Sequence, residues 1–329
     1  MKKFINSVDS LLDESLHGFA LAHGDIVRYN PEPRYIARLN PKAQGKVALI
    51  SGGGSGHEPL HLGFIGTGML DAACPGQVFT SPTPDQMLAA AMDVETGGGV
   101  LFIVKNYAGD VMNFEIAGEM LDCPNASVLV HDDVSIPEHQ GMGRRGVAGT
   151  TIVEKIVGAA AEAGLNLDEC KALGERVVRA TASMGVALTS CTVPALGKPT
   201  FNIADDEMEL GVGIHGEKGR ERIGLLKASE IIEQLAHTIH EELKPAKGQE
   251  VLLHVNGFGA TPMIELYLLY DLARQYWDHR GVVVTRSLVG NYTTSLDMAG
   301  ASITLTLLDE ELTRYWDAPV HTAALRWGC

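Results

Sequence analysis

The first half of the chain alternates short apolar runs with stretches of helical periodicity. Three apolar runs read KVALISG, VLFIVKNY and SVLVHDD, and they begin at Lys46, Val100 and Ser127. The segment PDQMLAAAMDV between the first two has its apolar residues at helical spacing. This alternation predicts β-α-β units and a mainly parallel sheet flanked by helices. Ligand sites of such sheets lie beyond the carboxyl ends of the strands, where the Gly, His and Asp clusters of this chain stand.

Two further helices follow, TTIVEKIVGAAAEAG from Thr150 and NLDECKALGERVVRATASMG from Asn166. Asn166 with Glu169 three residues later is typical of a capping box, in which each side chain binds the other residue's backbone N–H. We expect the second helix to close an N-terminal α/β domain that spans residues 1–185.

From residue 186 the pattern changes to shorter apolar runs with more turns: GVALTSCTV, MELGVGIHG, VLLHVNGFGA, VVVTRSLVG and ASITLTLL. One clear helix, TPMIELYLLYDLARQYWDH, begins at Thr261. The segment KPAKGQE from Lys244 is short and polar, and it predicts a loop within the domain. The fold class is therefore α/β with two α/β domains, and the second, at 186–329, has a mixed sheet.

Composition narrows the class of protein. A length of 329 residues fits two domains of common size. The chain carries 41 acidic and 26 basic residues, a formal charge of −15, which disfavours nucleic acid and anionic membrane surfaces as partners. The five cysteines have no CxxC spacing, which favours free thiols in a reducing compartment and no metal site. With neither a signal-peptide pattern nor an apolar run of ~20 residues, we expect a cytoplasmic protein.

A glycine-rich loop, SGGGSGHEP at Ser51–Pro59, follows the first apolar run. A Walker A motif needs Lys and Ser or Thr after its last glycine, but His57 and Glu58 follow Gly56. The dinucleotide pattern GxGxxG also fails, because a histidine takes the place of its third glycine. Glycine backbone can still converge several N–H groups on a small oxygen-rich ligand such as a polyol or sugar. A tight turn without a ligand is the alternative.

Two more motifs place reactive side chains at strand ends. KNYAGD puts Lys105 five positions before Asp110, and GVGIHGEKG sets His215 among glycines that leave space around the imidazole. Each residue also has a structural interpretation. Asp110 is a candidate N-cap for the helix VMNFEIAGEM, Lys105 a solvated charge at a strand end, and His215 an ordinary turn histidine.

Taken together, these motifs resemble the dihydroxyacetone kinase K subunit family. The resemblance extends along essentially the whole chain through FTSPTPDQ, VKNYAGDVMNFE, GRRGVAGT, CTVPALGKPTF, NGFGATP, NYTTSLDMAG and WDAPVHTAALRWG. It implies a phosphotransferase subunit that binds dihydroxyacetone as a covalent hemiaminal on His215 and yields dihydroxyacetone phosphate. The catalytic residues it implies are His215, His57 and Asp110, and the substrate-binding residues are Gly54, Ser55, Gly56, His57, Lys105 and Asp110. Ser81 in FTSP is a further candidate contact.

The resemblance also implies partners. No nucleotide-binding motif stands in the sequence, and in the family ADP or ATP with Mg belongs to a separate L subunit. That L subunit delivers the phosphoryl group and is itself recharged by a phosphotransferase-system subunit or binds ATP directly. The family's K subunits are homodimers, which we expect here as well.

The covalent capture and the proton transfer that the resemblance implies are reactions that histidine and aspartate side chains can perform. Imidazole, with an ordinary pKa of ~6.5, is largely neutral near neutral pH and can attack a carbonyl carbon. Glycerol offers no carbonyl and is rejected. Asp110 and His57 can share the proton of the reacting hydroxyl, and which of them holds it stays open. Two other functions also stay open: a ketose-sensing coactivator that acts on a transcriptional regulator, and a kinase subunit for a four-carbon ketose.

Overall fold

The computed structural model describes residues 2–41, 44–138 and 141–329. Cα packing divides the chain into two compact units. The first, which we call the glycine-loop unit, comprises residues 2–130, 150–176 and 314–329. The second, the histidine-loop unit, comprises residues 131–149 and 177–313. The expected domain boundary between residues 185 and 186 lies inside a strand, so the packing favours a different division and the two expected ranges stay a prediction.

The glycine-loop unit contains a six-stranded sheet with the order β1-β2-β5-β3-β6-β7. The pairs β3·β5, β3·β6 and β6·β7 are parallel, which confirms the mainly parallel sheet that the apolar runs predict. The pairs β1·β2 and β2·β5 are antiparallel and form one edge. The strands are β1 (Val27–Pro31), β2 (Arg34–Arg38), β3 (Ala48–Ser55), β5 (Ala72–Val78), β6 (Val100–Lys105) and β7 (Asn125–Val130).

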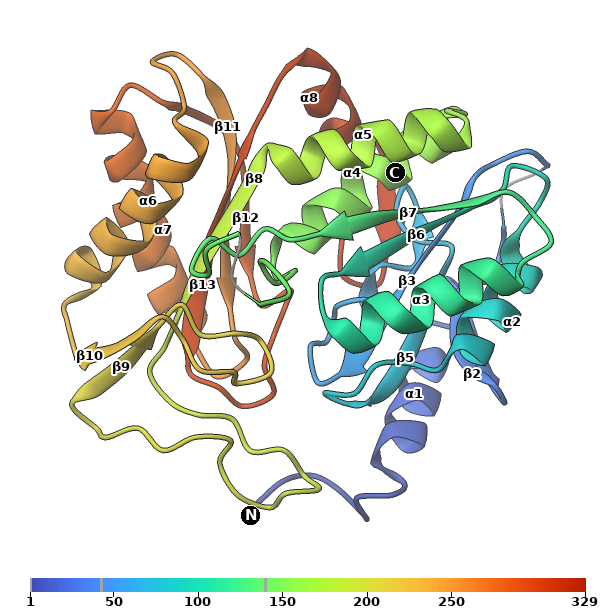
Figure 1. Ribbon diagram of the computed structural model, residues 1–329, viewed down its shortest axis with the longest axis horizontal. Coiled ribbons are helices and arrows are strands. Elements are labelled where there is room, and N and C mark those ends of the chain that lie inside the picture. The colour runs from blue at the N-terminus through green and yellow to red at the C-terminus, as the bar shows by residue number, and fades with distance from the viewer. Residues whose placement is uncertain (1, 42–43, 139–140) are drawn as a thin grey trace. The chain divides into compact units, whose positions relative to one another are not determined.

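Helices α2 and α3 cover one face of this sheet (Figure 1). Their buried side chains form one core cluster with Ile50, Phe102 and Val104 of the strands. The predicted helix at 84–94 is confirmed by α2. The helices of this unit are α1 (Leu11–Ala22), α2 (Pro84–Val94), α3 (Ala108–Met120), α4 (Gly149–Ala163) and α5 (Leu167–Arg179). The first residue of α4 and the last three residues of α5 are assigned to the histidine-loop unit.

The predicted capping box at the start of α5 is confirmed. The Asn166 backbone N–H donates to Glu169 Oε2 at 2.9 Å, and the Glu169 N–H donates to Asn166 Oδ1 at 3.0 Å. The predicted extension of this helix to residue 185 is wrong, because α5 ends at Arg179 and Thr181–Ala187 forms β8. All seven residues of β8 are buried, and periodicity does not separate a short, wholly buried strand from a helix.

A small three-stranded sheet, in the order β15-β14-β4, completes this unit. Its strands are β4 (Gly66–Thr67), β14 (Val320–Thr322) and β15 (Arg326–Trp327), and a short 3-10 helix, η1 (Leu62–Phe64), precedes β4. The glycine loop and the last residues of the chain therefore pack in the same unit.

The histidine-loop unit contains a six-stranded sheet in the order β10-β9-β8-β13-β11-β12. The pair β11·β12 is parallel and the other pairs are antiparallel, which confirms the predicted mixed sheet. The strands are β8 (Thr181–Ala187), β9 (Glu207–Leu210), β10 (Glu221–Gly224), β11 (Glu250–Gly257), β12 (Val283–Gly290) and β13 (Gly300–Leu307).

Helices α6 (Ala228–Leu243) and α7 (Met263–His279) cover one face of the mixed sheet (Figure 1), and α8 spans Glu310–Asp317. The sequence predicts one clear helix in this unit, which corresponds to α7. This prediction is wrong because it omits α6. Its buried residues Ile231, Leu235 and Ile239 recur every four positions, as an amphipathic helix requires. This spacing of apolar residues is visible in the sequence, but many charged residues lie between them.

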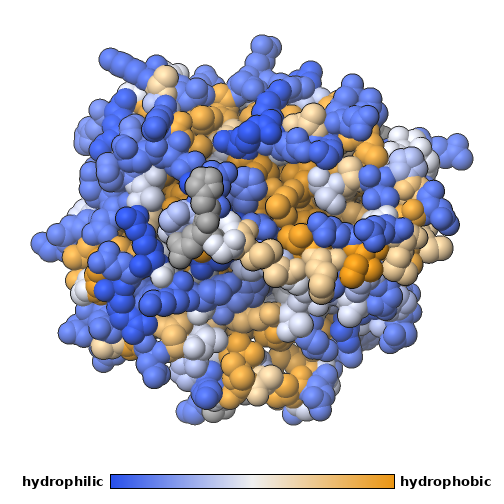
Figure 2. Space-filling model, in the orientation of Figure 1, coloured by the Kyte–Doolittle hydropathy of each residue, from blue (hydrophilic) through white to orange (hydrophobic). Residues whose placement is uncertain are grey.

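Hydrophilic side chains cover much of the face seen in Figure 2, with hydrophobic patches between them. Among the residues that the structure describes, no helix combines the length and apolarity needed to cross a bilayer. All five cysteines are free thiols, as their spacing predicts.

Candidate functional site

The glycine loop begins inside β3, which continues to Ser55, beyond the predicted strand end. A Cβ at Gly53 would lie 2.2 Å from Lys105 Nζ and 3.5 Å from Asp110 Oδ2. Gly53 therefore lets the backbone come closer to these two side chains than any other residue would. Gly56 has a φ of 105°, a conformation that favours glycine. The loop backbone is thereby fixed next to the two charged residues of the KNYAGD motif.

Lys105 and Asp110 form a buried ion pair. Lys105 ends β6, is 0% exposed, and directs its ammonium to Asp110 Oδ2 at 3.4 Å. Asp110 is 4% exposed and lies in the first turn of α3, whose N-cap is Tyr107. The two structural interpretations, a solvated strand-end charge and an N-cap, are thus wrong. The start of a helix favours a negative charge, and the paired ammonium offsets the cost of burying it.

His57 is also buried, and its ring stacks on Phe79 with centroids 5.0 Å apart and an interplanar angle of 14°. The Ser55 hydroxyl donates to the Gly76 carbonyl at 2.7 Å. Ser81 is half-buried, and Asn113 Nδ2 donates to its Oγ at 3.5 Å. A shared proton between His57 and Asp110 stays a prediction.

Sequence reasoning missed a buried group behind Lys105. His61 Nε2 lies 3.1 Å from Lys105 Nζ, and His61 Nδ1 lies 2.5 Å from Glu154 Oε1 and 3.0 Å from Ser51 Oγ. Burial raises the pKa of Glu154 to about 8. Burial, the charge of Lys105 and the electrostatic interaction with His57 hold the pKa of His61 well below its ordinary value. The available signals were a second histidine, His61, two residues after the glycine loop and a carboxylate, Glu154, within the apolar residues of α4.

His215 lies in the turn between β9 and β10 and has a carboxylate partner. Its Nδ1 is 2.8 Å from Glu217 Oε1, and its backbone N–H donates to Glu217 Oε2 at 2.9 Å. Burial raises the pKa of Glu217, but the hydrogen bond from His215 and the charges of His215 and Arg145 outweigh it and lower this pKa to about 2. An ionised carboxylate only accepts hydrogen bonds, so Nδ1 carries a proton, and whenever the ring is neutral its lone pair is on Nε2.

Arg145, from the GRRGVAGT motif, supports the start of the His215 turn. Its guanidinium donates to the Gly211 carbonyl at 2.7 Å and pairs with Asp133 at 2.6 Å. Both Arg145 and Asp133 are buried. The sequence signal for Glu217 was its position two residues after His215 in the same motif, and sequence reasoning overlooked it.

The predicted site residues fall into two groups. His57, Lys105, Asp110 and the glycines belong to the glycine-loop unit, while His215 belongs to the histidine-loop unit. Within the described residues, no group of three or more His, Cys, Asp or Glu side chains could hold a metal ion.

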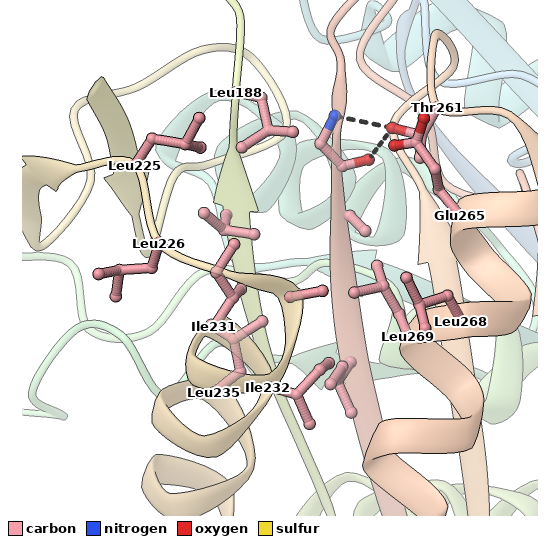
Figure 3. A pocket seen from close by; sticks show the side chains of 15 residues that line it. Leu188, Leu225, Leu226, Ile231, Ile232, Leu235, Thr261, Glu265, Leu268 and Leu269 are labelled. Atoms are coloured by element: carbon pink, nitrogen blue, oxygen red, sulfur yellow. Dashed lines mark hydrogen bonds between the residues drawn. The ribbon is translucent and has the colours of Figure 1, made fainter. Parts of the chain in front are cut away.

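An apolar pocket of about 180 Å³ lies in the histidine-loop unit, between α6, α7 and the mixed sheet (Figure 3). Leucine and isoleucine side chains dominate it, and Glu265 is the one ionisable residue among the described residues that line it. At one end the Thr261 hydroxyl donates to the Gly300 carbonyl at 2.6 Å and accepts from its N–H at 2.8 Å. This lining suits apolar contacts and lacks the groups that phosphoryl transfer needs.

Comparison with known proteins gives full-length relatives. The chain is 46% identical over 356 aligned positions to the "PEP-dependent dihydroxyacetone kinase, dihydroxyacetone-binding subunit DhaK" of Escherichia coli (strain K12), with all of both chains covered. It is 48% identical to "PTS-dependent dihydroxyacetone kinase 1, dihydroxyacetone-binding subunit DhaK" of Listeria innocua, and the match covers 98% of this chain and 100% of the relative.

Solved structures have the same fold. The "Dihydroxyacetone kinase operon co-activator Dha-DhaQ" matches with a TM-score of 0.88 at 34% identity, over 94% of this chain and 97% of the other. The native dihydroxyacetone kinase of C. freundii also gives 0.88, at 33% identity, over 99% of this chain and 60% of the other. The model of the Dak1 domain matches residues 17–324, and the chain therefore belongs to the Dak1 domain family.

Proposed function

We propose that this chain is the dihydroxyacetone-binding subunit of a dihydroxyacetone kinase, a phosphotransferase that yields dihydroxyacetone phosphate. The names of its full-length relatives support the substrate and the reaction. One structural observation carries the proposal, namely the contact between His215 Nδ1 and Glu217 Oε1 at 2.8 Å. It places the ring proton on Nδ1 and the lone pair of the neutral ring on Nε2, and a nucleophilic imidazole is what the capture of a ketone requires.

In the proposed capture step, the Nε2 lone pair of His215 forms a bond to the keto carbon. The π electrons of the carbonyl move to its oxygen, which takes up a proton and becomes the hydroxyl of a hemiaminal. The ring then carries a positive charge, with its proton still on Nδ1. The carboxylate of Glu217, 2.8 Å from Nδ1, stabilises this cation. Glycerol has no carbonyl and cannot enter this step.

The terminal hydroxyl of the captured ketose must lose a proton when it accepts the phosphoryl group. We assign this proton to Asp110, assisted by His57, and leave open which of the two holds it. Lys105 stabilises the Asp110 carboxylate, since the two groups are 3.4 Å apart and buried. We assign the backbone of Gly54 and Ser55 as N–H donors for the ketose oxygens, and Gly56 as a backbone contact whose own N–H donates to the Glu58 carboxylate at 3.0 Å. Positioned acid–base groups contribute roughly 10²- to 10⁴-fold to a rate.

The phosphoryl donor belongs, in this proposal, to a separate L subunit that carries ADP or ATP with Mg. The chain has no phosphate-binding motif of its own in SGGGSGHEP, and its described residues hold no metal cluster. The words "PEP-dependent" and "PTS-dependent" in the relatives' names favour an L subunit that is recharged indirectly by the phosphotransferase system. A cytoplasmic homodimer is the expected state.

A second function, a ketose-sensing coactivator of a transcriptional regulator, has its own support. A co-activator of a dihydroxyacetone kinase operon has the same fold at a TM-score of 0.88. Binding alone does not require an acid–base pair, so the presence of Asp110 and His57 in the chain in addition to His215 favours the kinase subunit. A four-carbon ketose in place of dihydroxyacetone remains an alternative substrate.

The test combines turnover with adduct detection. The purified chain is mixed with dihydroxyacetone, and a reversible adduct is sought by native mass spectrometry, with His215→Ala as the control. Turnover is then measured with an L subunit and its phosphoryl donor, and three- and four-carbon ketoses compete for the site. We expect an adduct in the wild type alone, together with turnover. An adduct without turnover would favour the sensor, and an adduct that survives in His215→Ala would exclude the covalent mechanism.

A further inference from the structure

The ammonium of Lys105 is held by three acceptors. It donates to the Gly52 carbonyl at 3.1 Å, to His61 Nε2 at 3.1 Å and to Asp110 Oδ2 at 3.4 Å. An ammonium group has three N–H bonds, so each proton has one acceptor. The side chain is 0% exposed, and the loss of an acceptor would leave a buried N–H without a partner.

His61 can accept this hydrogen bond through one of its tautomers alone. Nε2 has a free lone pair in the neutral ring when the proton is on Nδ1. Two acceptors face Nδ1, Glu154 Oε1 at 2.5 Å and Ser51 Oγ at 3.0 Å. The Ser51 hydroxyl gives its own proton to the Ile103 carbonyl at 2.7 Å, which leaves its oxygen free to accept. The Lys105 ammonium, which can only donate, requires the tautomer with its proton on Nδ1, and both oxygens that face Nδ1 can accept from it.

The charges in this group balance when Glu154 is neutral. The charged groups that face it are Lys105 from β6 and Asp110 from α3, and their charges cancel; His57 faces it from the glycine loop. Among the described residues no donor reaches Glu154 Oε2, and an ionised oxygen in that position would be costly. Burial raises the pKa of Glu154 to about 8, in agreement with a neutral carboxyl group at neutral pH.

We propose that Glu154 and His61 are positioning residues for the phosphorylation step: Glu154 fixes the His61 tautomer, and His61 Nε2 holds the Lys105 ammonium at its place beside Asp110. This inference rests on the proposed function, in which Asp110 handles the proton of the ketose hydroxyl. Neither residue needs to touch the substrate. Without the His61 acceptor, the ammonium would interact more strongly with Asp110. This stronger interaction would stabilise the ionised carboxylate and make it a weaker base.

Two matched pairs of variants test the assignment. Glu154→Gln keeps an oxygen that accepts from Nδ1, whereas Glu154→Met keeps the length and removes the acceptor. His61→Gln can place an amide oxygen where Nε2 was, whereas His61→Met cannot accept. Rates with an L subunit are measured across pH, and ketose capture at His215 is measured separately. Melting temperatures establish that each variant folds.

We expect both Met variants to lose about 10- to 100-fold in kcat, by analogy with the loss of a hydrogen-bonded support of a metal ligand. The acid limb of the pH–rate profile should also move, while capture at His215 stays near the wild-type level. Both Gln variants should retain most of the rate and the wild-type profile. Met variants that fold and keep the wild-type rate and pH profile would overturn the assignment.

A direct measurement of the tautomer separates this inference from the proposed function. Nitrogen NMR of the ring of His61 distinguishes a proton on Nδ1 from one on Nε2, and it needs neither ketose nor L subunit. We expect the Nδ1–H form in the wild type and in Glu154→Gln, and a mixture of tautomers in Glu154→Met. An Nε2–H ring in the wild type would refute the positioning role even if the kinase activity is found. If the wild type shows the Nδ1–H form of His61 but no turnover, the proposed function is refuted and the tautomer assignment is not.

Discussion

Replacement of Glu217 by Gln tests the proposed capture step most directly. The glutamine keeps the size of the side chain and an oxygen that can accept from His215 Nδ1, but it removes the negative charge. In the wild type this charge lies 2.8 Å from the ring nitrogen, and the low pKa of Glu217, about 2, keeps it ionised at neutral pH. The change therefore weakens the stabilisation of the imidazolium that forms when the ketose is bound covalently.

The magnitude follows from the kind of hydrogen bond that is lost. Bonds to charged groups contribute about 1.5–3 kcal/mol and neutral ones about 0.5–1.5 kcal/mol, so the difference is about 1–1.5 kcal/mol. The Glu217 side chain is 34% exposed, and solvent screening favours the lower end. About 1 kcal/mol corresponds to a roughly fivefold weaker covalent binding of dihydroxyacetone. Glu217→Ala removes the acceptor altogether, and we expect a loss of about 10- to 100-fold.

The assay is a titration of the chain with dihydroxyacetone, in which the adduct fraction is measured by native mass spectrometry. His215→Ala defines the level without adduct. Glu221→Gln is a matched control, because it removes an exposed carboxylate from β10 of the same unit. Equal adduct affinity in Glu217→Gln and the wild type, together with no adduct in His215→Ala, would refute the role of the Glu217 charge.

Three more predictions concern the glycine-loop unit. Because the pKa of Glu154 is raised to about 8, the folded state binds more protons than the unfolded one, so stability should fall as pH rises from about 4.5 to about 8. Melting temperatures should show a smaller fall in Glu154→Gln, and an equal fall would contradict the raised pKa. Lys105→Met should lower the free energy of unfolding by about 3–5 kcal/mol in urea titrations, because Asp110 stays buried without its cation; an unchanged midpoint would contradict this. Gly53→Ala should reduce turnover, since its Cβ would lie 2.2 Å from Lys105 Nζ, whereas Gly18→Ala, with nothing within 4 Å, should leave turnover intact; similar turnover in the two variants would contradict the steric argument.

The sequence predicts the parallel and mixed sheets because long apolar runs at strand spacing are local features. It also predicts where the reactive motifs stand, since KNYAGD follows directly on a strand. It does not predict that Lys105 is fully buried, because two of its three acceptors, Gly52 and His61, lie far from it along the chain. One of them, His61, is 44 residues away along the chain, and the contact between His61 and Glu154 spans 93. Contacts at such separations depend on how the helices pack on the sheet.

The misplaced end of α5 has a different physical cause. Residues of the segment Thr181–Ala187 are small or apolar and all buried, so neither period 2 nor period 3.6 stands out. The domain boundary expected at residue 185 depended on that same segment. A strand that is buried on both faces reads as a continuous run, and here it was attached to the helix before it.

The imidazoles of His215 and His61 make the same kind of contact, with opposite consequences for the charge of the partner carboxyl group. Each has a carboxylate at Nδ1, Glu217 at 2.8 Å from His215 and Glu154 at 2.5 Å from His61. Glu217 is partly exposed and accepts hydrogen bonds from the ring and the backbone of His215, so it is ionised and can stabilise a cation that forms during a reaction. Glu154 is wholly buried and holds its proton, so it can fix a tautomer without adding a charge beside the Lys105–Asp110 pair. In the proposed roles, burial of the carboxylate, rather than residue type, therefore separates the histidine that captures the ketose from the one that supports Lys105.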